Sequence, residues 1–353
     1  MAMIEGAILV INAGSSSVKY ALFDGDMVEV LSGQRDVDPA LSGGHSAALQ
    51  DILAELSERG FALADLRAAA HRVVHGGAGL TAPCRVDAGV LGQIRAAIPL
   101  APLHNPHNLL GITALAEIAP ELPQFASFDT AFHATNPEVA TRYGVPDDWV
   151  ARGVRRYGFH GTSYQSLVET FPEVTGEALP KRVLAFHLGN GASICAIYQG
   201  QSVATTMGYS PLEGLTMGTR AGSIDAGAVL DMAEMDGIEA TRAALNQRSG
   251  LVALSGGESD MKTLCGRSDR RAGFAVDHFC YWAARHGGSM IAAMQGVDAI
   301  VFTGGIGENA ADIRARIMAQ LQWAGVGGAQ IQVIPAQEER QIARNARALM
   351  AGK

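Results

Sequence analysis

Two short stretches of the chain, about half its length apart, follow the same plan. Residues 8–24 read ILVINAGSSSVKYALFD, and residues 183–200 read VLAFHLGNGASICAIYQG. Each combines an apolar strand, a glycine-rich polar turn and a second apolar strand, and such a turn presents backbone N–H groups to a phosphate chain. One such turn is usually only a turn, but the repeat requires an architectural cause. We therefore expect a duplicated α/β core that closes on a nucleotide from two sides.

The composition is that of a globular protein with more than one core. The 353 residues are too many for one small core, so two domains are expected. A net charge of −8 argues against a general affinity for nucleic acid or anionic membranes. The N-terminus lacks the basic start of a signal peptide, and no apolar run is long enough to span a bilayer. We predict a cytoplasmic protein without nucleic-acid or membrane partners.

Cysteine and histidine spacing gives no metal site. Cys84, Cys195, Cys265 and Cys280 lack CxxC spacing and are expected to be small buried hydrophobes in a reducing compartment. The segment 104–107, HNPH, resembles a metal pair only in its spacing. No Cys or Glu lies close to it, so we expect a structured turn there.

Hydrophobic periodicity predicts alternating helices and strands. Helices are expected at 48–59, 107–119, 274–294, 310–323 and 337–350, and strands at 69–74, 125–132, from 183, at 299–302 and at 330–335, with a loop at 39–46. The glycine-rich residues 303–309 form a predicted strand-to-helix turn, which either binds phosphate or ribose or is a plain turn. A Walker A sequence is missing from the chain, which excludes a P-loop kinase.

Arginine and histidine side chains lie in glycine-flanked turns. Arg72 lies in HRVVHGG, His160 in RYGFHGTS and Arg220 in MGTRAG. Flanking glycines indicate a close approach of the backbone, and Arg suits bidentate contacts with phosphate or carboxylate. The alternatives are a surface ion pair for each Arg and a core histidine for His160. Asp129 follows a predicted strand, where the sites of α/β proteins lie, although a helix cap is the other interpretation.

Eight motifs then occur in an order that resembles one family. They are NAGSSSVKY, HRVVHGG, LAPLHNPHN, FDTAFH, YGFHGTS, HLGNGAS, PLEGLTMGTR and FTGGIGEN. Together they resemble the acetate kinase family, within the acetate and sugar kinase/Hsp70/actin superfamily. The resemblance implies a duplicated ribonuclease-H-like α/β core of the actin/Hsp70 type, with two domains and an interdomain cleft. Residues 1–133 and 340–353 would form the N-terminal domain, and residues 134–339 a C-terminal domain that binds nucleotide and forms a homodimer.

The resemblance also implies a role for each motif residue. Asp129, His160 and Arg220 would be catalytic, and Arg72 would bind substrate beside an apolar acyl pocket of Val74, Leu103, Phe159 and Pro211. Asn12 and Glu338 would bind Mg²⁺, with Mn²⁺ as an alternative. The nucleotide would be bound by Ser15, Ser17, Lys19, His187, Leu188, Gly189, Asn190, Gly191, Asp260, Met261, Lys262, Gly305, Ile306, Gly307, Glu308 and Asn309.

The implied reaction is reversible phosphoryl transfer between ATP and acetate, giving acetyl phosphate and ADP. A carboxylic acid with a pKa near 4 is already ionised at neutral pH, so it needs cancellation of charge and no general base. Two arginines, a histidine donor and Mg²⁺ supply that cancellation, and Asp129 is expected to orient the metal's waters or an arginine. The alternatives are propionate or butyrate as acceptor and pyrophosphate as donor. A non-catalytic actin- or Hsp70-like protein is disfavoured, because it has no use for these arginines.

Overall fold

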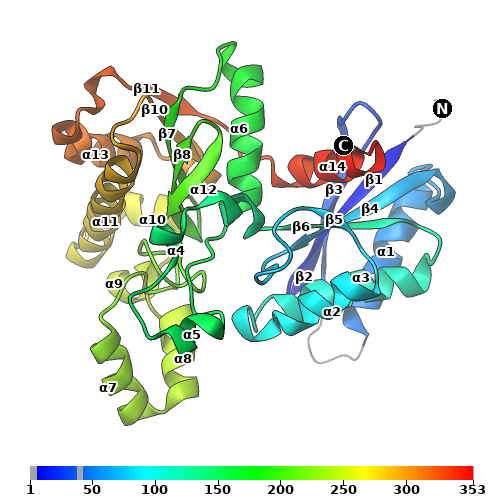
Figure 1. The fold of residues 1–353 in the computed structure, drawn as a ribbon, viewed down its shortest axis with the longest axis horizontal. Coiled ribbons are helices and arrows are strands. Elements are labelled where there is room, and N and C mark those ends of the chain that lie inside the picture. The colour runs from blue at the N-terminus through cyan, green and yellow to red at the C-terminus, as the bar shows by residue number, and fades with distance from the viewer. Residues whose placement is uncertain (1–5, 38–42, 353) are drawn as a thin grey trace. The chain divides into compact units, whose positions relative to one another are not determined.

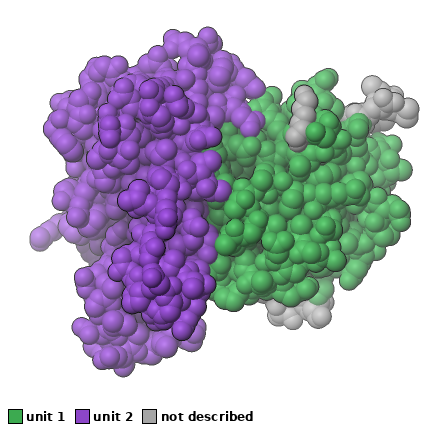
Figure 2. Space-filling view, in the orientation of Figure 1, with its two compact units in different colours: residues 1–132, 161–166, 337–353 green, residues 133–160, 167–336 purple. Residues whose placement is uncertain are grey.

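The chain forms two compact units in the computed structural model, which describes residues 6–37 and 43–352. Unit 1 comprises residues 1–132, 161–166 and 337–353, and unit 2 comprises residues 133–160 and 167–336 (Figure 2). The loop predicted at 39–46 lies outside the described residues as far as residue 42. None of the helices in the described ranges has the length and apolar character needed to span a bilayer.

Unit 1 is built on a six-stranded sheet in the order β3-β2-β1-β4-β6-β5 (Figure 1). The strands are β1 Ala7–Ala13, β2 Ser17–Phe23, β3 Glu29–Asp36, β4 Leu66–Val73, β5 Cys84–Arg85 and β6 Gln124–Phe128. β1 and β2 form the predicted hairpin, and β4 lies parallel to β1 on its other side.

Alternate residues of β1 face different helices, as expected for a strand buried on both sides. Leu9 and Ile11 pack with residues of α1 (Gly44–Glu58) and α3 (Asn105–Ile118). Ile8 and Val10 pack with residues of α14 (Glu338–Met350), which closes the other face. The shorter α2 (Ala88–Ala96) contributes Val90 and Ile94 to a further cluster.

Unit 2 repeats the same pairing of strands. Its sheet has the order β11-β10-β7-β8-β9, with β7 Arg182–Leu188, β8 Ala192–Tyr198, β9 Gln201–Thr205, β10 Ala299–Thr303 and β11 Gln330–Val333. β7, β8 and β9 are antiparallel neighbours like β1, β2 and β3, and β10 lies parallel to β7 as β4 does to β1. The predicted duplicated α/β fold is therefore confirmed.

Helices connect and cover this second sheet. They are α4 Glu138–Thr141, α5 Asp147–Ala151, α6 Gly161–Thr175, α7 Ala226–Asp236, α8 Ile238–Gln247, α9 Leu251–Ser255, α10 Met261–Gly266, α11 Arg270–Met294, α12 Gly304–Asn309 and α13 Ala311–Leu321. The first residues of α6 are grouped with unit 1. The long α11 buries Phe279 and Cys280 and exposes Phe274 and Tyr281.

Several local predictions were wrong. The turn predicted at 303–309 is the helix α12, because Glu308 Oε1 accepts the N–H of Gly304 and Asn309 Nδ2 donates to the carbonyl of Gly305. The turn predicted at 104–107 is the start of α3, where Pro106 fits because the first helical turn has no use for its missing N–H.

Two further differences concern burial and the length of a strand. Cys265 is exposed and Cys84 is half-buried, whereas Cys195 and Cys280 are buried as expected. The strand predicted at 125–132 ends at Phe128, because a 3₁₀ helix occupies Ala131–Thr135.

Candidate active site

Arg72 and Asp129 form a bidentate ion pair in unit 1. Arg72 Nε lies 3.0 and 3.1 Å from the two carboxylate oxygens of Asp129, and Nη2 lies 2.6 Å from Oδ2. Asp129 is only 2% exposed. Burial disfavours the charged form of Arg72, but the carboxylates of Asp129 and Glu338 outweigh it and hold its pKa above the ordinary value. The carboxylate thus fixes the orientation of the Arg72 guanidinium.

The ends of two parallel strands place this pair. Arg72 lies in β4 and Asp129 directly follows β6, its parallel neighbour. The carbonyl of Asp129 accepts the N–H of Gly161 at 2.8 Å, and a Cβ on Gly161 would lie 2.3 Å from that oxygen. Thr162 Oγ1 adds a hydrogen bond of 3.3 Å to the carboxylate. The glycine after His160 is therefore required by a close approach of the backbone.

The two residues expected to bind a cation both belong to unit 1. Asn12 lies half-buried in β1, and Glu338 begins α14. Burial is the largest cause that raises the pKa of Glu338, to about 7, and the negative charge of Asp129 adds to it. Amide and carboxylate oxygens are donors that a hard divalent cation prefers, so the chemistry of these two residues is compatible with a magnesium ion.

His160 lies in a strained turn of unit 2. Its φ angle of 57° is in the left-handed region, directly before α6. Nδ1 contacts Ser193 Oγ on β8 at 2.9 Å, and the ring stacks on His187 with a centroid distance of 4.2 Å. The preceding Gly158 is also left-handed, and a Cβ there would lie 2.6 Å from the ring of His133. His160 is held by side chains as well as by its backbone, so it is more than a core histidine bonded to backbone.

Arg220 approaches the same glycine turn as His160. A Cβ placed on Gly191 would lie 2.9 Å from Arg220 Nη2 and 3.1 Å from His160 Nε2. The other terminal nitrogen of the Arg220 guanidinium, Nη1, donates to the carbonyl of Pro211 at 2.7 Å. The structure therefore brings His160, Arg220 and Pro211 together at the β7–β8 turn.

Two of the predicted nucleotide-binding stretches also meet in unit 2. The stretch 187–191 runs from the end of β7 through the β7–β8 turn, and a Cβ on Gly304 would lie 2.8 Å from the carbonyl of Leu188. A Cβ on Gly189 would lie 3.9 Å from the backbone nitrogen of Gly305. Glu308 Oε1 accepts N–H groups from Gly304 and Ala336, so this carboxylate holds the segment together. The backbones of the two Gly-rich segments therefore lie close together.

The third predicted nucleotide-binding stretch, residues 260–262, forms the start of a helix. Asp260 accepts the N–H of Thr263 at 2.7 Å at the start of α10, and this bond lowers its pKa. Met261 is buried, whereas Asp260 and Lys262 are exposed. In the first hairpin, Ser15 and Lys19 are exposed and Ser17 is half-buried. Apart from Met261, these side chains are at least partly accessible to a ligand.

The predicted acyl-pocket residues differ in burial. Val74 and Phe159 are buried at 8% and 1% exposure, Pro211 is half-buried, and Leu103 is 44% exposed. The backbone N–H of Val74 donates to Asn108 Oδ1 at 3.0 Å, and Asn108 Nδ2 donates to the carbonyl of Ala13. Asn108 on α3 therefore ties the ends of β1 and β4 together.

Sequence reasoning missed the side chains that support the predicted ones. Ser193, Thr162 and Asn108 hold His160, Asp129 and Val74 from distant parts of the chain. The only signal for Ser193 in the sequence was its place in the HLGNGAS motif. Thr162 and Asn108 lie in the motifs YGFHGTS and LAPLHNPHN, from which other residues were chosen.

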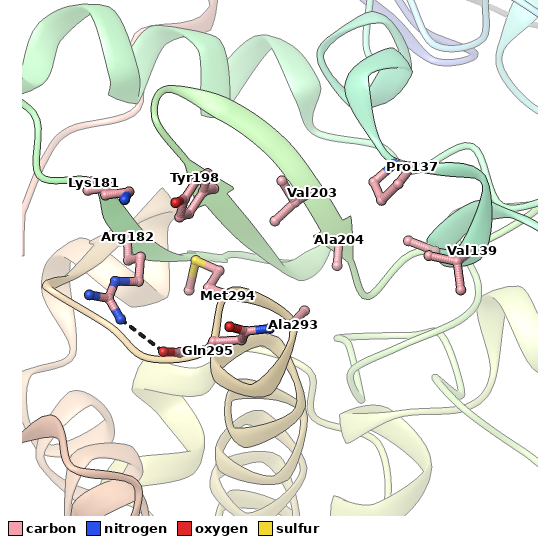
Figure 3. A pocket seen from close by; sticks show the side chains of 11 residues that line it. Pro137, Val139, Lys181, Arg182, Tyr198, Val203, Ala204, Ala293, Met294 and Gln295 are labelled. Atoms are coloured by element: carbon pink, nitrogen blue, oxygen red, sulfur yellow. Dashed lines mark hydrogen bonds between the residues drawn. The ribbon is translucent and has the colours of Figure 1, made fainter.

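A groove of about 660 Å³ lies elsewhere in unit 2 (Figure 3). Lys181, Arg182 and Tyr198 lie at one end, and Val203 and Met294 lie further along it. Arg182 is engaged by the carbonyl of Gln295 and by Asp298. None of the predicted site residues lines this groove.

Comparison with known sequences points to a single family. The model of the acetokinase family matches residues 7–345. An acetate kinase of Rhodopseudomonas palustris is 42% identical over 90% of this chain and 87% of its own length. An acetate kinase of Deinococcus radiodurans is 41% identical over 98% of both chains.

Solved structures give the same result. The acetate kinase of Porphyromonas gingivalis has a TM-score of 0.87 at 31% identity and covers 98% of this chain and all of its own. A propionate kinase of Francisella tularensis has a TM-score of 0.87 at 33% identity, over 96% and 98% of the two chains. A ROK hexokinase of Thermus thermophilus, 12% identical with a TM-score of 0.52 over 98% of this chain and all of its own, shares the fold alone. The chain belongs to the acetokinase family.

Proposed function

We propose that this protein is an acetate kinase, which transfers a phosphoryl group reversibly between ATP and acetate to give acetyl phosphate and ADP. The observation that carries the proposal is the convergence of Arg220 and His160 on the Gly191 turn. That turn belongs to a backbone surface of the kind that binds phosphates. Family membership supports the carboxyl group as the acceptor.

The proposed chemistry is cancellation of charge. Acetate is an anion at neutral pH and must approach an anionic γ-phosphate, so repulsion opposes the reaction. We assign Arg220 and Arg72 to the charge of the moving phosphoryl group, with His160 as a hydrogen-bond donor to it. Asp129 orients Arg72 through two hydrogen bonds from Nε and one from Nη2. None of these residues needs to accept a proton from acetate.

We propose Asn12 and Glu338 as the residues that hold Mg²⁺. When bound, the ion would screen the charge on the phosphates of ATP. The raised pKa of Glu338 supports this assignment, because burial disfavours the ionised carboxylate and a bound cation would stabilise it. We also propose that the two compact units act as the two domains, with Arg72 supplied by unit 1 and Arg220 by unit 2. A cytoplasmic location and a homodimer complete the proposal.

A second candidate is propionate kinase. It is favoured by the similarity to the propionate kinase of F. tularensis and by the apolar character of Val74 and Phe159. Substrates that differ by one methylene are separated by only about 1–3 kcal/mol in an apolar pocket. Acetate should therefore be preferred by a modest factor.

One assay tests both candidates. Acyl phosphate is trapped as the hydroxamate with acetate, propionate or butyrate as acceptor, and with ATP or pyrophosphate as donor. The highest kcat/KM with acetate and ATP is the expected result. A higher kcat/KM with propionate would instead support a propionate kinase. ATP turnover that does not respond to any added carboxylate would refute both candidates.

A further inference from the structure

Glu213 joins two segments that carry proposed catalytic residues. Its Oε1 lies 2.7 Å from Nη1 of Arg156, and its Oε2 accepts a hydrogen bond of 2.6 Å from the hydroxyl of Tyr143. Arg156 lies four residues before His160, and Glu213 lies between Pro211 and Arg220. The ion pair therefore connects the loop of His160 to the loop of Arg220.

The backbone around Gly208 makes the same connection. Its carbonyl accepts the N–H groups of Tyr157 and Gly158 at 3.0 and 3.2 Å, just before His160. The N–H of Tyr209 donates to the hydroxyl of Tyr143 at 3.0 Å. A Cβ on Gly208 would lie 1.7 Å from Glu213 Oε2 and 2.3 Å from Tyr143 Oη. Only glycine lets the chain pass this close to the carboxylate and the phenol.

The charges in this cluster are mostly shielded from water. The side chains of Arg156 and Glu213 are 22% and 35% exposed, and the guanidinium of Arg156 lies 5.0 Å from the centre of the Tyr143 ring. Burial and the hydrogen bond to Glu213 raise the pKa of Tyr143, so its hydroxyl remains a donor. The N–H of Arg156 donates to the carbonyl of Thr141 at 2.7 Å, which keeps Arg156 and Tyr143 adjacent.

Glu213 is connected to Arg220 through the main chain at Pro211. Arg220 Nη1 donates to the carbonyl of Pro211, two residues before Glu213. Holding Glu213 therefore fixes the acceptor that orients the guanidinium. Catalysis by preorganised charges depends on placement within a fraction of an ångström.

We propose that Glu213, Tyr143 and Arg156 form a positioning clamp that fixes Arg220 against His160. The clamp rests on the proposed function, and its residues act through Arg220 and His160 without contacting the substrate. Loosening it should lower kcat and leave KM for ATP unchanged, because the nucleotide is bound by other segments.

The test uses Glu213→Gln and Tyr143→Phe, with Glu239→Gln as a control. The control removes another ion pair of unit 2, between Arg242 and Glu239 on α8 at 3.4 Å. Each clamp variant should lower kcat about 10- to 100-fold, whereas the control should retain the parent value. Tyr143→Phe keeps the ring and removes only the hydroxyl, so it remains informative if Glu213→Gln folds poorly. Parent kcat in both clamp variants would overturn the clamp.

A second measurement separates positioning from a general loss of structure. Glu213→Gln is combined with Arg220→Ala, and single-turnover rates are compared. If the clamp acts by fixing Arg220, most of its effect should vanish once that side chain is absent. The same fold-loss in both backgrounds would overturn it. A parent enzyme that makes no acyl phosphate would instead refute the proposed function.

Discussion

At the scale of single residues, Arg220 and Arg72 differ in the interaction that is lost when each is replaced by Ala. Arg220 donates to a backbone carbonyl, so Arg220→Ala should lower kcat about 100- to 1,000-fold with little loss of stability. Lys should rescue poorly, because it cannot reproduce the planar fork. Steady-state kinetics and thermal melting of both variants test this, and near-parental kcat in Arg220→Ala would contradict the assigned role.

Substitution of Arg72 tests the catalytic role less selectively than substitution of Arg220, because it also affects stability. Its removal leaves the buried carboxylate of Asp129 unpaired, and breaking a buried ion pair costs about 3–5 kcal/mol. We therefore expect Arg72→Ala to destabilise the fold as well as to lower kcat. Arg72→Ala should melt well below the parent, whereas Arg220→Ala should not.

His71 makes the stability of unit 1 depend on pH. It lies buried with its Nε2 2.6 Å from the side-chain amide of Gln124, and burial lowers its pKa to about 4. The unfolded chain then binds a proton at higher pH than the folded one, so stability is full above the ordinary pKa of 6.5 and falls as the pH drops towards 4. His71 should contribute about 1.4 kcal/mol per pH unit to the slope in this window, beside the contribution of His75, whose pKa burial also lowers to about 4. Urea unfolding of the parent and of His71→Gln at pH 7 and 5 measures it, and equal pH dependence of the two would exclude His71 as the cause.

Val74 should set the limit on acceptor size. It is β-branched, buried and fixed through its N–H by Asn108, so it cannot move aside easily. Val74→Ala should therefore raise kcat/KM for propionate relative to acetate. An unchanged ratio in a folded variant would mean that Val74 only packs within unit 1.

At the scale of elements, the start of α12 depends on one glycine. Gly304 has a φ of 78°, and a Cβ there would lie 2.8 Å from the carbonyl of Leu188. Gly304→Ala should destabilise the fold by at least about 1–2 kcal/mol, the cost of the left-handed conformation alone. Gly305, its neighbour in the helix, has open space around it and no left-handed φ, so Gly305→Ala is the control. Equal urea midpoints for the two variants would contradict the close approach.

The same element shows what sequence can and cannot predict. The strand before α12 and the helix after it follow from hydrophobic periodicity. The helical turn itself does not, because three glycines oppose a helix and the bonds that close it come from Glu308 and Asn309. Likewise, the motifs identified His160 and Arg220, but the contact from Glu213 to Tyr143 spans 70 residues and leaves no local pattern. Periodicity therefore predicts elements, whereas tertiary contacts determine how site residues are held.

At the scale of the whole molecule, the two duplicated units carry different sets of proposed site residues. Unit 1 carries Arg72, Asp129, Asn12 and Glu338, and unit 2 carries His160, Arg220 and the glycine-rich turns after β7 and β10. Each sheet places its polar residues where a hairpin turn or a parallel strand ends. The proposed reaction uses both sets, so neither half of the duplication suffices for it.

The proposed homodimer should form through the exposed aromatic face of α11. Phe274 and Tyr281 are 56% and 54% exposed there, while the opposite residues of the helix are buried in unit 2. Large exposed aromatic side chains are enriched in interfaces. The parent should scatter light as twice the 36.9 kDa chain mass at micromolar concentration, and Tyr281→Glu should shift it towards the monomer. Val28→Glu, at an equally exposed position of unit 1, should leave the dimer intact. A monomeric parent would refute the dimer, and a dimeric Tyr281→Glu variant would move the interface to another surface.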